Sequence, residues 1–415
     1  MKPKFYGWVV ITMLFISYSA TTVSTNTLPF FFPELMKEFG WLHAEVVRPA
    51  SFYFLYIALF SPIIGIVLTR VTPKNVILFG ITLSFFCTIG FAMMSQYLHL
   101  HLVYLVFSLA ISCCGLLPSM VIISNWFQKK RGLATGIFLV GSSAGNIIFP
   151  QLASRLVLTY HDWRTAAIGV AIVAAFLSFI PWFFIKNSPE EKGQFRDGED
   201  LESSINSQQS ASMSNQSFEV GFLFKSPVFY LLLIITAAFW FCGFGVLQNL
   251  RLYLTDYGFN IQQAANISGL FSVFSIIGKI SFGYLSDKFN KINVLIMATV
   301  GLIAGVLSLK MVSVNTNFAY LYALCYGIGY SGAFAMIQLT VAELYRGESF
   351  KKVLSIVNSF DSIGGFAGVA LMGYLRTQDG NYGNAMSLLL AVCSLALVLS
   401  LVLRKQIGIG RHQGK

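Results

Sequence analysis

The stretch Val76–Met94, V-I-L-F-G-I-T-L-S-F-F-C-T-I-G-F-A-M-M, contains no charged residue and is apolar on every face. Runs of this kind recur along the whole chain, and a helix of about 20 apolar residues crosses the ~30 Å hydrocarbon core of a bilayer. Lipid cannot satisfy backbone amides, so such runs must form helices or a closed barrel. Barrel strands alternate in polarity, which this stretch does not. The sequence therefore predicts helices that span a membrane.

The composition of the chain indicates the same class. Of its 415 residues, 56% are hydrophobic and only 11% are charged, whereas soluble domains carry roughly a quarter charged residues. The mean hydropathy is +0.70. The net charge of +11 comes from basic residues scattered through the loops, so we interpret it as a topology signal and expect no nucleic-acid partner.

The apolar runs predict an all-α membrane protein with twelve transmembrane helices in two pseudo-symmetric six-helix bundles. The predicted spans are residues 8–30, 46–69, 75–95, 99–124, 132–158, 164–186, 228–251, 262–285, 292–311, 317–343, 352–375 and 383–403. The six cysteines fall inside these runs, which indicates packing residues and neither a disulfide framework nor a metal site.

A polar segment separates the two halves. Residues 187–226 are rich in Ser, Gln, Asn, Glu and Gly, a composition that cannot bury enough apolar surface to order itself. We predict an N-terminal bundle over 1–186, a cytoplasmic flexible linker over 187–226, and a C-terminal bundle over 227–415 that ends in a short basic tail.

The distribution of basic residues predicts the orientation. With the N-terminus placed inside, the cytoplasmic loops and tails hold all but eight of the 28 Lys and Arg residues, the exceptions being Lys37, Arg48, Arg155, Arg164, Arg251, Lys279, Lys310 and Arg376. Cytoplasmic loops carry such an excess. We therefore expect a multi-pass protein of the inner (plasma) membrane with both termini cytoplasmic. No cleavable signal is evident before the first run.

Two loops repeat at one offset. Gly65 and Gly283 open corresponding loops 218 residues apart (283 − 65), and Asn125 and Glu343 are separated by the same 218 (343 − 125). Equal offsets in equivalent places of a 6+6 topology indicate an internal duplication. Many secondary transporters are built from such repeats, with the solute site at the midplane.

The loop G-Y-L-S-D-K-F-N-K at 283–291 resembles the G-x-L-x-D-x-x-x-[KR] loop of the major facilitator superfamily. In that family the loop forms a conformational latch, which implies gating roles for Asp287, Lys288 and Lys291. The first-half copy has Thr69 in place of the Asp. The G-P pair of drug exporters is missing from the fifth span, which counts against multidrug efflux.

Three further stretches resemble the monocarboxylate and oxalate/formate porters of this superfamily. They are F-Y-G-W at 5–8, N-W-F-Q-K-K-R-G-L-A-T-G at 125–136, and H-D-W-R at 161–164. The second stretch includes Arg131, which we assign to the gate. It opens a stripe of small residues at Gly132, Gly136, Gly141 and Gly145, which predicts close approach of a neighbouring helix.

Two charged residues lie deep in predicted spans. Lys279 precedes Asp287 by eight residues, and Asp361 follows Lys351 by ten, so both lie about 12–15 Å into the membrane. Charges at the centre of a span cost about 2.5–3.5 kcal/mol and mark function or a buried partner. The alternatives are a purely structural ion pair, or a substrate site in which Lys279 attracts an anion and Asp361 holds its counter-charge or carries a coupling proton.

The resemblance supports a solute-binding role for Lys279, but two other positions depart from those porters. K-I-S-F-G at 279–283 is similar to the R-x-x-G of the eighth span in those porters, where a cation binds carboxylate. Ser275 stands where eukaryotic monocarboxylate porters carry an Asp, and Asn26 where they carry a Lys. Asn26 can hydrogen-bond a solute without offering charge, so both positions depart from the pattern of lactate/proton transport in that family.

Several other polar residues are candidates for the solute path. Tyr330 and Gln338 lie with Tyr326 in the tenth span, and Gln248 and Asn249 close the seventh span near the outer face. The helix-capping alternative remains open for the last pair. Arg48, near the outer face, is either a snorkelling side chain or a residue of an outer gate.

The sequence favours a secondary transporter of a small organic anion, coupled to protons or working by exchange. An importer of zwitterionic amino acids or of a carboxylate siderophore is an alternative, and a non-transporting sensor is another. No ATP-binding loop, nucleophile–base pair or midmembrane His relay occurs, so we expect neither an enzyme nor a cofactor. The expected partners are the solute, protons and membrane lipid. We expect the protein to be a monomer.

Overall fold

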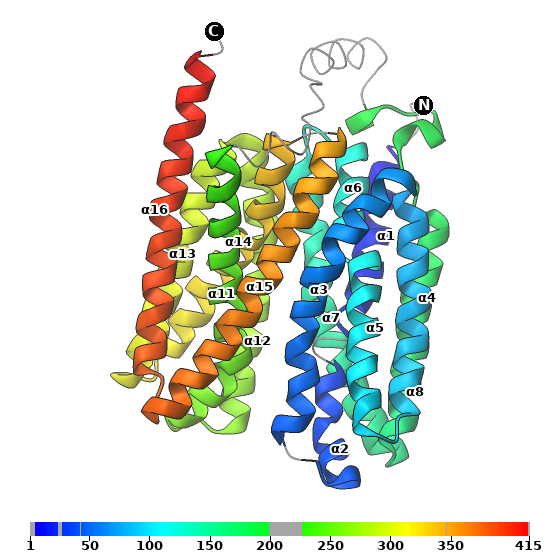
Figure 1. Cartoon of the computed structure of the whole chain (residues 1–415), viewed down its shortest axis with the longest axis vertical. Coiled ribbons are helices and arrows are strands. Elements are labelled where there is room, and N and C mark those ends of the chain that lie inside the picture. Colours follow the sequence, from blue (N-terminus) through cyan, green and yellow to red (C-terminus); the bar gives the residue numbers. More distant parts are fainter. Residues whose placement is uncertain (1–4, 24–26, 42, 199–225, 346, 414–415) are drawn as a thin grey trace. The chain divides into compact units, whose positions relative to one another are not determined.

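The computed structural model describes residues 5–23, 27–41, 43–198, 226–345 and 347–413, and the regular structure in these ranges is helical (Figure 1). Eleven helices in them are long and apolar enough to cross a membrane. Their membrane-length parts are Arg48–Arg70, Pro73–Ala92, Tyr97–Trp126, Arg131–Tyr160, Trp163–Phe184, Pro227–Asp256, Asn266–Lys288, Lys291–Ser313, Phe318–Leu344, Ser349–Arg376 and Gly383–Ile407. The predicted all-α membrane fold is confirmed.

The chain forms two compact units. One contains residues 1–216 together with Leu354–Ile356, and the other contains residues 217–353 and 357–415. The first unit holds α1 (Gly7–Ala20), α2 (Phe32–Phe39), α3 (His43–Arg70), α4 (Pro73–Ala92), α5 (Tyr97–Cys114), α6 (Leu116–Trp126), α7 (Arg131–Tyr160) and α8 (Trp163–Phe184). The second holds α11 (Pro227–Asp256), α12 (Ile261–Lys288), α13 (Lys291–Lys310), α14 (Phe318–Leu344), most of α15 (Gly347–Asp379) and α16 (Gly383–Gln413).

The first predicted span, over 8–30, falls partly outside the described residues, and its described parts are not one uniform α-helix. The α1 helix ends at Ala20, and after the gap in the description the chain continues as a 3₁₀ turn, Leu28–Phe31, and then as α2. Just after α1, Thr21 and Thr22 donate their hydroxyls to carbonyls three residues back.

The fourth span bends at a glycine. The expected helix over 99–124 is divided into α5 and α6 at Gly115, whose φ/ψ of −87°/−136° is not helical. Pro118 follows in the first turn of α6, where the missing N–H of proline costs no hydrogen bond. The bend therefore follows from a glycine and a proline spaced by three residues.

Small residues bring α7 against α1, as the stripe in the sequence predicted. A Cβ at Gly141 would collide with the carbonyl oxygen of Phe15, and one at Gly145 with that of Ser19. Both obstacles are backbone atoms and cannot rotate away. The close approach is thus confirmed at these two glycines, in the packing role expected for small residues at membrane helix contacts.

The second unit uses glycines in the same way on two helix pairs. On α15, a Cβ at Gly364 would collide with the carbonyl oxygen of Ala237 on α11. On α12, a Cβ at Gly278 would meet the backbone of Ile328 on α14, 2.8 Å from its carbonyl oxygen. The helices α11, α12, α14 and α15, which hold the candidate site residues of this unit, are therefore fixed by backbone contacts.

The predicted linker begins with ordered structure. Residues 189–192 and 196–198 form short 3₁₀ turns, and the carboxylate of Asp197 accepts hydrogen bonds from the amides of Gln128, Lys129 and Lys130 at 2.7–3.2 Å. These amides precede the N-terminus of α7, where an anion is stabilised. Residues 187–198 thus belong to the fold of the first unit. Residues 199–225 lie outside the described ranges, so the flexibility predicted for them stays a prediction.

Candidate functional site

The two membrane-embedded charged residues lie in the second unit and are both buried. Lys279 on α12 is 5% exposed and Asp361 on α15 is 0% exposed. Counted from the ends of the membrane-length segments at Lys288 and Ser349, they lie about 14 Å and 18 Å along their helices. Their depths are therefore about one helical turn apart, a little further than the sequence suggested.

Asp361 has no partner for its carboxyl group among the described residues. Neither of its oxygens accepts a hydrogen bond, and the ion pairs within 4.0 Å do not include it. Thr236 of α11 lies beside the carboxyl but donates its hydroxyl to Leu233 O at 3.1 Å. The fixed Lys279–Asp361 ion pair that the sequence left open as a structural alternative is therefore absent from this part of the structure.

Gln338 on α14 is a second buried side chain with an unused polar group. It is 0% exposed, and within the described ranges neither its amide nitrogen nor its amide oxygen has a hydrogen-bond partner. Buried polar groups in proteins are nearly always paired, and exceptions call for an explanation. Gln338 and Asp361 are thus two buried polar side chains of one unit whose polar groups are unpaired among the described residues.

Aromatic side chains of α11 and α14 contact one another in the same unit, a feature that the sequence indicated only through Tyr326 and Tyr330. Tyr330 stacks on Tyr326 with ring centroids 5.9 Å apart and an interplanar angle of 3°. Phe334 follows one turn later, with its centroid 5.6 Å from that of Trp240 on α11. Tyr326 is fixed by its hydroxyl, which donates to Cys242 O at 2.8 Å. Trp240 and Phe334 were not predicted as site residues, because aromatic side chains are common in every span.

The other residues predicted to contact the solute differ in their burial and in their position. Asn249 is buried, donates to Gly245 O at 2.9 Å and accepts from the Tyr382 hydroxyl at 3.5 Å, so it joins α11 to the start of α16. Gln248 is exposed, as is Arg48 on α3. Asn26 lies outside the described residues. Lys279, Asp361, Gln338, Tyr330, Gln248 and Asn249 therefore all lie in the second unit, whereas Arg48 lies in the first.

The predicted latch residues lie where α12 ends and α13 begins. Lys291 forms an ion pair with Glu343 at the end of α14, with Nζ and Oε2 3.0 Å apart. Lys288 lies over the Tyr284 ring at 4.5 Å, and Asp287 is half-buried. In the first unit, Arg131 donates from Nε to Phe127 O at 3.2 Å. The Lys291–Glu343 pair joins the start of α13 to the end of α14, and the Arg131–Phe127 bond joins α7 to the end of α6.

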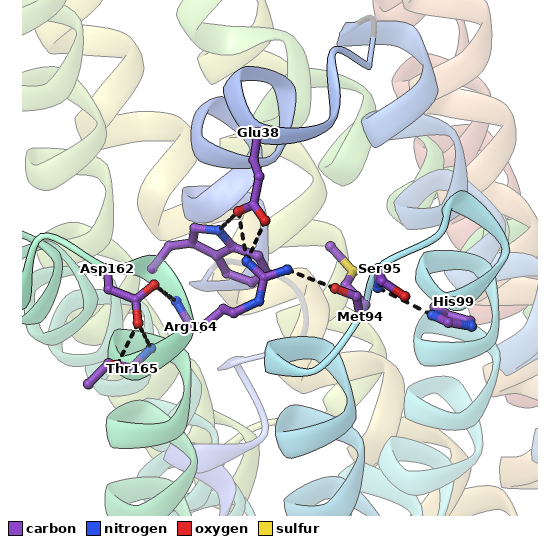
Figure 2. Close-up of polar contacts among 8 residues, drawn as sticks. Glu38, Met94, Ser95, His99, Asp162, Arg164 and Thr165 are labelled. Atoms are coloured by element: carbon purple, nitrogen blue, oxygen red, sulfur yellow. Dashed lines mark hydrogen bonds and ion pairs between the residues drawn. The ribbon is translucent and has the colours of Figure 1, made fainter.

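A polar cluster of the first unit was missed by the sequence reasoning (Figure 2). Glu38 on α2 accepts from Arg164 Nη1 at 2.6 and 2.7 Å and from Trp163 Nε1 at 2.6 Å, and Arg164 Nη2 donates to Met94 O at 3.0 Å. Asp162 caps α8 through the amides of Arg164 and Thr165. The cluster joins α2, the α4–α5 loop and the start of α8, which are remote from one another in the sequence.

Electrostatics reinforce this cluster. The hydrogen bond from the Trp163 indole, followed by the hydrogen bond and charge of Arg164, holds the pKa of Glu38 below its usual value of 4.5. The Thr165 hydroxyl lowers the pKa of Asp162 in the same way. Both carboxylates are therefore ionised at neutral pH, as charge-assisted hydrogen bonds require. The opposite charges of Glu38 and Arg164 were the sequence signal available for this contact.

Comparison with known proteins agrees with the fold and the resemblance. The chain is 27% identical over 332 residues to the agnestins efflux protein AgnL12 of Paecilomyces divaricatus, covering 77% of this chain and 69% of that protein. It is 23% identical over 424 residues to monocarboxylate transporter 12 of Rattus norvegicus, covering 96% and 84%.

Solved structures share the same architecture. The proton:xylose symporter XylE matches with a TM-score of 0.78 at 12% identity, covering 95% of this chain and 94% of that one. The human organic anion transporter MFSD10 matches with a TM-score of 0.76 at 15% identity, covering 96% and 100%. The family model described as Major Facilitator Superfamily matches residues 14–369 and 262–410. The chain is a multi-pass membrane protein that belongs to the major facilitator superfamily.

Proposed function

We propose that this protein is a secondary transporter of a small organic anion, in which Lys279 attracts the anion and Asp361 carries the coupling proton or holds the counter-charge. The observation that supports this most is the buried Asp361 carboxyl without a hydrogen-bond partner among the described residues. A structural carboxylate in such a place would be paired, since an isolated buried charge is costly.

Asp361 suits a group that changes its charge during a transport cycle. With a proton bound, the carboxyl is neutral and its burial costs far less than that of a carboxylate. After release of the proton, the negative charge needs a cation, and Lys279 is a buried cation of the same unit. In this cycle, an anionic solute and the Asp361 carboxylate would alternate as the counter-charge of Lys279.

Tyr330 and Gln338 would add hydrogen-bonding and apolar contacts to the solute, and Asn26, Gln248 and Asn249 are retained as further candidates. Asp287, Lys288, Lys291, Arg131 and Arg48 are proposed to act at the gates. Lys291 is supported in this role by its ion pair with Glu343. We further propose an inner-membrane location with both termini cytoplasmic, and bundles over 1–186 and 227–415.

The test is a thermal-shift screen of the purified protein against carboxylates and amino acids, repeated with Lys279→Ala and Asp361→Asn. A monocarboxylate should stabilise the wild type, and Lys279→Ala should abolish this stabilisation. Unchanged shifts in Lys279→Ala would remove Lys279 from the site.

A follow-up experiment in proteoliposomes distinguishes the alternatives. Uptake of an anion without an amine supports the proposal, whereas a strict requirement for the amine would assign the protein to zwitterions instead. Binding of a carboxylate without counterflow would identify a sensor and contradict transport.

A further inference from the structure

Five partly exposed rings form a continuous wall in the second unit. They belong to α11, α12 and α14, and we call them the ring wall: Trp240, Phe244, Phe271, Tyr330 and Phe334. Their centroids follow one another at 5.0 Å for Trp240–Phe244, 5.6 Å for Trp240–Phe334, 6.4 Å for Tyr330–Phe334 and 6.1 Å for Phe271–Tyr330. Each ring therefore touches another ring from its own or a neighbouring helix.

Glycines shape the wall. A Cβ at Gly243 would collide with the Tyr330 ring, so this ring lies directly on the α11 backbone. Gly365 of α15 leaves room for the edges of Trp240 and Phe244, whose carbons would be 3.7 and 3.4 Å from an added Cβ. The rings consequently pack against glycine backbone that carries no side chain, and this contact fixes their orientation on that side.

On α11, Trp240 of the ring wall is turned away from the exposed apolar position Ile234. At 100° per residue, Trp240 lies about 120° around α11 from Ile234, whose side chain is 49% exposed. An aromatic side chain of α11 that only filled a contact with lipid would be expected on the side of Ile234. The position of Trp240 and its partial exposure are therefore suited to a ligand.

Charged and polar groups border the wall on two sides. On α12, Ser275 and Lys279 follow Phe271 at steps of four, and helical side chains lean toward the N-terminus, so the Lys279 side chain leans toward Phe271. On α14, Gln338 follows Phe334 by one step of four, with its buried amide unpaired among the described residues. A ligand with a flat apolar ring and one carboxylate matches this arrangement.

We infer that the transported anion is an aromatic carboxylate whose ring stacks on the ring wall while its carboxylate is bound by Lys279. The inference rests on the proposed function and names the substrate class. Offset stacking and edge-to-face contacts between aromatic rings contribute beyond the area they bury, and an aliphatic ring of equal size cannot make them.

The experiment compares benzoate with cyclohexanecarboxylate, which has the same charge and a ring of similar size without the flat π-face. Dissociation constants are measured by calorimetry on the full-length protein in detergent. Benzoate should bind about 3- to 10-fold more tightly, the range that aromatic stacking provides. Phe334→Leu should reduce this ratio to near one while leaving the cyclohexanecarboxylate constant within about twofold.

Tyr320→Leu is the matched control, because Tyr320 lies on the same helix, is 53% exposed and is not part of the ring wall. It should keep the benzoate preference. Equal binding of the two acids by the wild type, abolished by Lys279→Ala, would overturn the inference and leave the anion proposal intact. Binding of neither acid, or binding that survives Lys279→Ala, would overturn both.

Discussion

Arg164 donates to both carboxylate oxygens of Glu38, at 2.6 and 2.7 Å, although 126 residues separate them in the sequence. The Arg164 guanidinium also lies over the Trp163 ring at 4.5 Å. Arginine is suited to this position because its planar fork binds a carboxylate and stacks on an aromatic ring at the same time. The pair fastens α2 to the start of α8.

Glu38→Gln should destabilise the protein by about 0.5–1 kcal/mol at neutral pH, since the pair is partly solvent-screened. The pKa of Glu38 is lowered in the folded state, so its contribution is full above the unfolded value near 4.5 and is lost as the pH falls through the folded value. Thermal unfolding between pH 3 and 7 measures this. The wild type should converge on the variant at the acid end, and a constant difference would contradict the assignment.

Gly364→Ala should disrupt the contact between α15 and α11, because the new methyl group meets the carbonyl oxygen of Ala237, which is backbone and cannot move aside. Overpacking of this kind costs about 1–3 kcal/mol. Gly373→Ala on the same helix is the control, since a Cβ there has no atom within 4 Å. Melting temperatures should fall for the first variant and stay equal or rise for the second.

Asp361→Asn should uncouple transport from the proton gradient while keeping exchange. The amide is neutral in every state, so it can neither release a proton nor supply a counter-charge. In proteoliposomes, accumulation of a carboxylate driven by an imposed pH gradient should fall to the level without a gradient, and counterflow should persist. Accumulation that still follows the gradient would assign the proton to another group.

Gly243→Ala should displace the Tyr330 ring from the α11 backbone. The preference for benzoate over cyclohexanecarboxylate should decrease, and the effect of Lys279→Ala on both acids should remain. Gly269→Ala provides the comparison, since a Cβ there also has no atom within 4 Å. An unchanged preference for benzoate in Gly243→Ala would show that Tyr330 does not contact the aromatic ring of the bound ligand.

Hydropathy was sufficient to predict most of the fold. Eleven of the predicted spans correspond to membrane-length helices among the described residues, because lipid forces any long apolar run into a helix. The end of α1 at Ala20 was not predicted, because hydropathy averaged over a span does not register where a helix changes its hydrogen-bonding pattern.

The candidate site could be predicted only in part. Lys279 and Asp361 were identifiable because charge is rare and costly at membrane depth. The ring wall was not, since Trp240 and Phe334 differ from other aromatic residues only in the neighbours that helix packing gives them. The Glu38–Arg164 pair was missed for a related reason. Both residues lie near helix ends, where a charged residue is common and gives no signal in hydropathy.

The hydrogen bonds of Asp197 have a consequence for dividing the polypeptide. A first-half fragment cut at the apparent end of its last span would leave three amides before α7 without their acceptor. Co-expressed half-proteins should therefore assemble better when the break is placed beyond Gly198 than when it is placed at Lys186. The Asp197 carboxylate lies at the start of the connection between the halves, and it stabilises the half that precedes it.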